Sequence, residues 1–151
     1  MKWEASRGAI ENARNVLPKL LEKYLKEGRK AADGNRSPEE LHDFRIKTKA
    51  FRYTLELFRT LYGIRLEHGL EAIRELQSVL GKLHDFHIIA EALDGDKAIQ
   101  SKLERITKKK LNEFHALWAA FDSKGQIKRW KTLLAGGSAK AGAVQSKRRA
   151  R

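Results

Sequence analysis

The sequence predicts an all-α fold, an antiparallel bundle of about four long helices followed by a short fifth. Over most of the 151 residues, apolar side chains recur at intervals of three and four, the spacing of one buried helical face. No segment sustains the alternation of apolar and polar residues that is typical of a β-strand. Breaks that contain glycine and aspartate divide the helical pattern into segments.

The first two helices have the clearest boundary signals. The first is expected over residues 6–31, and Pro18 inside it should kink it or divide it. The second begins after Ser37, because serine is a preferred N-cap, proline suits the first helical position, and Glu40 is placed to close a capping box. It should extend to residue 62, where the following glycine ends it.

Three further segments complete the predicted bundle, over residues 66–93, 97–121 and 126–134. Residues 1–135 are therefore expected to form one helical domain, and residues 136–151 a basic, flexible tail. Large aromatic side chains favour the interior of such a bundle. The tryptophans expected in the core are Trp3, Trp118 and Trp130.

The charge of the chain indicates an anionic partner. It has 32 Lys and Arg against 19 Asp and Glu, a formal net charge of +13, and such an excess attracts nucleic acid, acidic membranes or polyphosphate. The absence of cysteine excludes disulfides, cysteine-ligated zinc and thiol chemistry. The sequence has no apolar run long enough to span a membrane and no signal-peptide core, so a soluble cytoplasmic protein is expected.

Four cationic or titratable side chains share one strip of the second predicted helix. At about 100° per residue they fall within an arc of about 80°; they are His42, Arg45, Lys49 and Arg52. An apolar row lies on each side of this strip. The first row is Phe44, Phe51, Leu55, Phe58 and Tyr62, and the second is Ile46, Ala50, Tyr53, Leu57 and Leu61. A cationic strip between two apolar rows is expected to line a crevice between helices.

Phosphate is the anion that best suits these side chains. The guanidinium groups of Arg45 and Arg52 can bind phosphate oxygens in pairs, Lys49 adds a point charge, and a protonated His42 donates a hydrogen bond. The strip extends over about 15 Å of helix axis, which favours an extended chain of phosphates over a single phosphate. The alternative is a solvated basic face whose charges pair with carboxylates of neighbouring helices.

The same helix resembles the signature helix of the CHAD domain, the conserved histidine α-helical domain. The family pattern has His, Arg, Val or Ile, Lys or Arg, and Arg at successive intervals of three, one, three and three. The matching residues are His42, Arg45, Ile46, Lys49 and Arg52. Residues 76–85 resemble the second block of the family, and residues 123–134 resemble the segment that closes one CHAD repeat.

The resemblance implies noncatalytic binding of inorganic polyphosphate along a basic cavity and association with polyphosphate granules. The phosphate-contacting positions would be His42, Arg45, Lys49 and Arg52. Family members usually contain two such repeats, whereas this chain has one, so a homodimer is expected to restore the paired arrangement. A polyphosphate-metabolising enzyme is a further implied partner. No cofactor, metal or catalytic residue is expected to take part.

A second basic surface is predicted on the helix expected over residues 97–121. Lys102, Arg105 and Lys109 share one side of that helix, opposite its apolar face. A solvated face is one interpretation, and a further wall of the same anion groove is the other.

Two other functions stay open from the sequence. A nucleic-acid-binding module is one, because basic residues surround Trp130 and aromatic side chains can stack on bases. A metal-dependent phosphohydrolase is the other, because His84, Asp85 and His87 can supply part of a metal site. The favoured interpretation of Asp85 is a capping contact or an ion pair with an arginine of the second helix.

Overall fold

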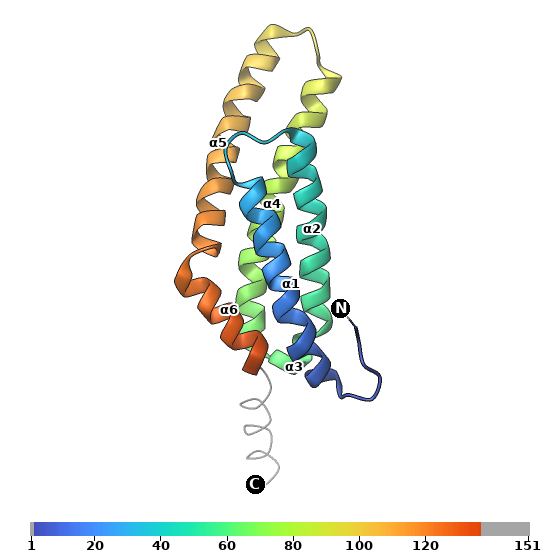
Figure 1. Cartoon of the computed structure of the whole chain (residues 1–151). Helices are drawn as coiled ribbons and strands as arrows, with labels where there is room; N and C mark the ends of the chain where they lie inside the picture. The colour runs from blue at the N-terminus through green and yellow to red at the C-terminus, as the bar shows by residue number, and fades with distance from the viewer. Residues whose placement is uncertain (1, 137–151) are drawn as a thin grey trace, which may run out of the picture.

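The computed structural model describes residues 2–136, and within that range the chain forms helices and no strand (Figure 1). The helices are α1 (Ala9–Ala31), α2 (Pro38–Leu57), α3 (Arg59–Tyr62), α4 (Ile64–Ala92), α5 (Lys97–Phe121) and α6 (Lys124–Gly136). The long helices α1, α2, α4 and α5 lie side by side, and α6 runs from the end of α5 back to α1. The predicted all-α bundle is confirmed. Of the predicted basic tail, residues 137–151 lie outside the described residues.

Helix α1 continues without interruption through Pro18. The predicted division at this residue is wrong, because Leu17 and Leu21 on either side of the proline are fully buried and hold the helix in the core. The helix begins later than the predicted residue 6, because the buried Asn12 side chain holds the preceding segment in a turn. Its amide nitrogen donates to the Glu4 carbonyl at 2.9 Å, and its Oδ1 accepts from the Glu4 amide at 2.8 Å.

Helix α2 begins at the predicted capping box. The Ser37 hydroxyl accepts from the Glu40 amide at 3.2 Å, and the Glu40 carboxylate accepts from the Ser37 amide at 2.9 Å. The helix ends before the predicted residue 62, because the chain turns at Phe58 into the short α3. This turn carries Tyr62 toward α6, where its buried hydroxyl donates to the Leu134 carbonyl at 2.9 Å.

The remaining helix boundaries lie close to those that the sequence predicts. Helix α5 spans the predicted residues 97–121, while α4 and α6 each begin two residues earlier than predicted. The break between α4 and α5 is a turn at Gly95, whose φ of 100° is a conformation that glycine adopts without strain. The following Asp96 caps α5, because its carboxylate accepts from the Ile99 amide at 3.1 Å.

An aromatic cluster joins α1, α2 and α5 in the middle of the bundle. Tyr24 of α1 stacks on Phe51 of α2 with ring centroids 4.4 Å apart, and it meets Trp118 of α5 edge-on at 5.8 Å. The buried Tyr24 hydroxyl shares a 3.0 Å hydrogen bond with Thr48. Gly28 lies one turn along α1 directly against the Trp118 ring, so that a Cβ at this position would clash. Close packing of these rings fixes α2 in the bundle.

The tryptophans differ in their burial. Trp118 and Trp130 are buried, as predicted. Trp3 is 55% exposed, and its one aromatic neighbour within residues 2–136 is the partly buried Phe58, with ring centroids 6.1 Å apart. Its predicted place in the core is wrong, because it belongs to the segment before α1 that runs along the outside of the bundle (Figure 1).

Candidate functional site

The predicted cationic strip lies where α2 packs against α4. His42 near the start of α2 stacks on His84 near the end of α4, and Glu56 at the other end of α2 reaches Arg74, so the two helices run antiparallel. The strip residues are all partly buried; they are His42, Arg45, Lys49 and Arg52. The strip is therefore held along a helix–helix junction and is not a freely solvated face.

A pair of stacked imidazoles forms one end of the strip. The ring centroids of His42 and His84 are 4.0 Å apart, and the ring planes differ by 20°. Burial lowers the pKa of His84, and the positive charges of His42 and Arg45 lower it further, against the opposing effect of Asp85. The Nδ1 atom of His42 is buried and has no hydrogen-bond partner in residues 2–136. An anion at this end would oppose both effects and favour the protonated His84 ring.

The middle of the strip carries cations without carboxylates. Arg45 crosses Gly81 of α4, where a Cβ would lie 3.7 Å from the arginine Nε. Among residues 2–136 that Nε is buried without a hydrogen-bond partner, and so is Oε1 of Gln77, one turn along α4. In the described part of the chain, the strip meets a carboxylate only at its Arg52 end, so Arg45 and Lys49 have none within 4.0 Å. The Nε of Arg52 is also buried without a hydrogen-bond partner within residues 2–136, so it is the lack of a carboxylate that makes the middle of the strip most suited to an anionic ligand.

The other end of the strip is partly neutralised by acidic side chains. The Nε atom of Arg52 lies 3.6 Å from Glu56, which also lies 3.4 Å from Arg74 of α4. Arg74 in turn donates to Glu67 at 2.8 Å. This network raises the pKa of Arg74, mainly through the hydrogen bond to Glu67. The ion-paired alternative that the sequence left open therefore applies at Arg52 and not at Arg45.

Four of the five residues in the second apolar row are exposed, contrary to the crevice that the sequence predicts, and the fifth, Leu61, is partly buried against the core. Ile46 is 50%, Tyr53 49% and Leu57 79% exposed, and Ala50 between them is also exposed. The first row packs in the core, with only its Phe58 partly buried. Among the described residues, no element covers the face of α2 that carries the second row. The strip therefore has core on one side and an open apolar surface on the other.

The predicted basic residues of α5 do not approach the strip closely. A cavity of about 250 Å³ separates α5 from the His42–His84 pair. Leu103 and Thr107 of α5 line this cavity, whereas Lys102, Arg105 and Lys109 do not. The latter three are exposed and form no ion pair within residues 2–136. They form a separate basic surface on the outside of α5.

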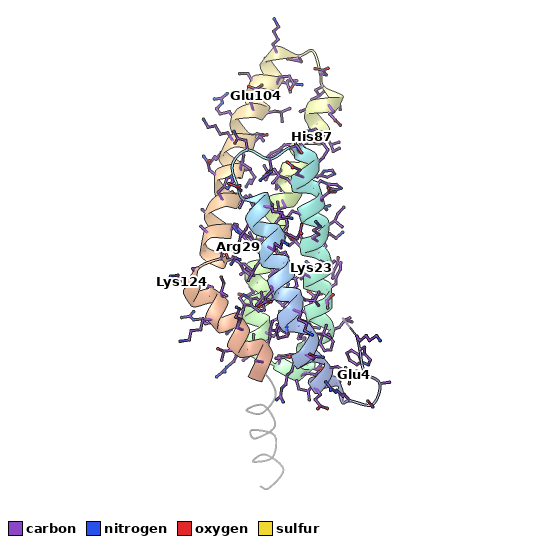
Figure 2. The ribbon with its side chains drawn as sticks, viewed as in Figure 1. Glu4, Lys23, Arg29, His87, Glu104 and Lys124 are labelled. Atoms are coloured by element: carbon purple, nitrogen blue, oxygen red, sulfur yellow. The ribbon has the colours of Figure 1, made fainter. Side chains whose placement is uncertain are left out.

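The histidines of α4 are not arranged as a metal centre. His87 lies near the start of α2 (Figure 2), and its Nε2 is 3.2 Å from Glu91 and 3.7 Å from Glu39. Within residues 2–136, no group of three or more histidine, aspartate or glutamate side chains is placed to hold a metal ion. Asp85 is exposed and makes no ion pair with α2 there, so the predicted interhelical pair is wrong. The α4 face that meets the strip presents His84, Gly81 and Gln77 in its place.

Sequence reasoning missed the contribution of α4 to the site. Gly81 and Gln77 lie at helical spacing from His84 and face the strip, but a single glycine or glutamine inside a helix carries no specific signal. Their place in residues 76–85, the block that resembles the second CHAD block, is the one signal that singles them out. Arg74 was missed as well, because its contact with Glu56 depends on the register of the two helices.

The fold and the site define a class of protein, an α-helical bundle with a partly buried cationic strip between two of its helices. Residues 2–94 match the CHAD domain family. The match covers more than half of the chain, which therefore belongs to this family. No curated protein and no solved structure shows a significant match. No helix within residues 2–136 is long and apolar enough to cross a lipid bilayer.

Proposed function

We propose that the protein binds inorganic polyphosphate noncatalytically along the strip of His42, Arg45, Lys49 and Arg52. The observation that carries this proposal is the state of Arg45 and Lys49, which are partly buried without a carboxylate within 4.0 Å in the described residues. An unpaired buried donor such as the Arg45 Nε costs about 1–3 kcal/mol. A phosphate oxygen would pair this donor and compensate the neighbouring positive charges.

The length of the strip favours a chain of phosphates. From His42 to Arg52 the helix advances about 15 Å, and each of its three turns offers at least one donor. A single phosphate would satisfy one turn and leave the others unpaired. An extended polyanion would contact the imidazole pair, the Arg45 guanidinium and the Lys49 ammonium together.

A nucleic acid is the second candidate ligand, favoured by one observation. Tyr53 is 49% exposed next to the strip, and the Arg52 guanidinium lies 4.6 Å from the centre of its ring. An exposed aromatic ring beside cations can stack on an unpaired base. Competition between polyphosphate and single-stranded nucleic acid at equal phosphate concentration separates the two ligands.

Calorimetric titration with polyphosphate tests the proposal. The double variant Arg45→Gln/Lys49→Gln should lose most of the binding heat that the wild-type chain gives. The matched control is Lys128→Gln/Arg129→Gln, which removes the same charge from exposed positions of α6. If both variants lost the same fraction of the binding heat, binding would depend on net charge alone, and the strip would not be the binding site.

Two finer assignments belong to the same proposal. Lys102, Arg105 and Lys109 would provide a weaker, separate contact for a long polymer, because they lie on the outside of α5. Binding of this kind would bring the protein to polyphosphate granules in the cytoplasm and would recruit or orient a polyphosphate-metabolising enzyme. Fluorescence microscopy of the wild-type chain and the Arg45→Gln/Lys49→Gln variant in cells with granules tests the localisation.

A further inference from the structure

We propose that two copies of this chain pair through the exposed apolar row of α2, and that polyphosphate drives this pairing. The row consists of Ile46, Ala50, Tyr53 and Leu57 and is called the α2 seam below. The inference rests on the proposed function and adds the partner surface, its register and its dependence on the anion.

The α2 seam has the spacing of a helix-pairing surface. Its four residues follow one another at intervals of four, three and four, as in the contact positions of paired helices. All four are exposed, and Leu57 is 79% exposed. A partner that covered this row would gain a free energy of about 25 cal/mol for each Å² of apolar surface removed from water.

The order of side chains in the α2 seam favours an antiparallel second copy. With a twofold axis midway between Ala50 and Tyr53, the small Ala50 faces the partner's Tyr53, and Ile46 faces the partner's Leu57. A parallel pairing would place two tyrosines against each other and two alanines against each other, which crowds one layer and leaves a gap in the next. One surface thus complements itself about a twofold axis, as a homodimer requires.

The antiparallel register also determines what happens to the cationic strip. In antiparallel helices, the same flank of each helix meets across the contact, so the strips of both copies lie along one edge of the seam. Arg45, Lys49 and Arg52 of one copy then face the partner's strip. Each chain carries a net charge of +13, so repulsion opposes this pairing in the absence of an anion.

Polyphosphate would reverse that balance. A chain of phosphates between the two strips neutralises both, so the anion binds the dimer more tightly than it binds one chain. By linkage, the anion must then tighten the dimer by the same factor, which we expect within the roughly 5- to 150-fold range of coupled sites. The α2 seam supplies the apolar contact, and the anion removes the repulsion that otherwise opposes it.

Light scattering of the full chain tests the proposal with a short linear polyphosphate no longer than one strip. At low salt and without polyphosphate, the wild-type chain should have the 17.3 kDa mass of one copy. On addition of the anion its mass should double. The double variant Ile46→Gln/Leu57→Gln should keep the mass of one copy while calorimetry still records binding. The control Ile99→Gln changes an apolar residue that is 37% exposed outside the seam, and it should behave as wild type.

Disulfide crosslinking tests the register. The chain has no cysteine, so each introduced thiol is unique. A mixture of Ile46→Cys and Leu57→Cys chains, one of them carrying a mass tag, should form the mixed disulfide when polyphosphate is added and oxidant follows. A disulfide between two Ile46→Cys chains would indicate parallel helices and would overturn the register.

The outcomes separate this inference from the proposed function. A mass of two copies with or without polyphosphate would overturn the linkage to the anion. Doubling that persists in Ile46→Gln/Leu57→Gln would mean that the polymer bridges separate chains, and would overturn the seam. Binding heat without any doubling in the wild type would refute the inference and leave the proposed function intact. Absence of binding heat in the wild type would refute both.

Discussion

Replacing Arg45 with methionine should stabilise the protein without ligand and weaken its stabilisation by polyphosphate. Within the described residues 2–136, the buried Arg45 Nε has no hydrogen-bond partner, a state that costs about 1–3 kcal/mol. Lys49, one turn away, adds a like-charge repulsion of roughly 0.2–0.5 kcal/mol. The residue is only partly buried, so we take the lower end, about 1 kcal/mol. Methionine keeps an apolar stem against Gly81, and the melting temperature should therefore rise by about 2–4 °C.

Polyphosphate should reverse the order of stabilities. At a ligand concentration 100 times its Kd, the wild-type chain gains about 2.7 kcal/mol. Loss of a bidentate contact worth about 3 kcal/mol would raise the Kd of Arg45→Met roughly 100-fold. The variant then gains only about 0.4 kcal/mol at the same ligand concentration. With ligand, the free energy of unfolding of the wild type should exceed that of the variant by about 1.3 kcal/mol. Without ligand, it should be about 1 kcal/mol lower than that of the variant.

Urea unfolding followed by far-UV circular dichroism, with and without polyphosphate, measures both differences. The control is Arg129→Met, because Arg129 is exposed on α6 and its replacement should change the free energy of unfolding by less than about 0.5 kcal/mol. A ligand-free Arg45→Met protein that is less stable than wild type would refute the reasoning. It would mean that the Arg45 charge and its buried Nε are already compensated within the fold.

Three further outcomes are expected. The pKa of His84 is lowered in the fold, so as pH drops the His84 imidazole is protonated at a higher pH in the unfolded chain than in the folded one. The free energy of unfolding should therefore fall as pH drops below about 6.5, and His84→Asn should reduce that fall. Lys49→Gln should make the logarithmic salt dependence of polyphosphate affinity less steep by about one, as measured by titration at several salt concentrations. Gly28→Ala should destabilise the fold by about 1–3 kcal/mol in urea unfolding, because its Cβ meets the Trp118 ring, whereas Gly125→Ala has open space and should not.

Local signals were sufficient for most of the fold. The capping box at Ser37 and the apolar spacing of α5 involve residues close in sequence, and the structure agrees with them. The end of α2 was misjudged because its cause is distant. The turn at Phe58 lets Tyr62 reach the Leu134 carbonyl of α6, a contact between residues 72 positions apart that no helical pattern contains.

In the candidate site too, features that depend on one helix could be predicted, and features that depend on packing between helices could not. A helical wheel places His42, Arg45 and Lys49 on one strip, because that depends only on the geometry of α2. It cannot tell which neighbouring row is covered, since burial depends on where α1 and α4 pack. The row with Leu57 proved to be exposed. The pairing of Glu56 with Arg74 likewise required the antiparallel register of α2 and α4.

The distribution of acidic residues along α2 is the strongest reason to regard the middle of the strip as a ligand site. The acids of this helix are Glu39, Glu40, Asp43 and Glu56, and within residues 2–136 none of them lies within 4.0 Å of the charged nitrogens of Arg45 or Lys49. The facing part of α4 presents Gly81 and Gln77, which are neutral. A surface selected only for solubility or stability would gain by placing a carboxylate on either helix here. Neither helix places a carboxylate beside Arg45 and Lys49 within residues 2–136, so their positive charge is available to an anion from solution.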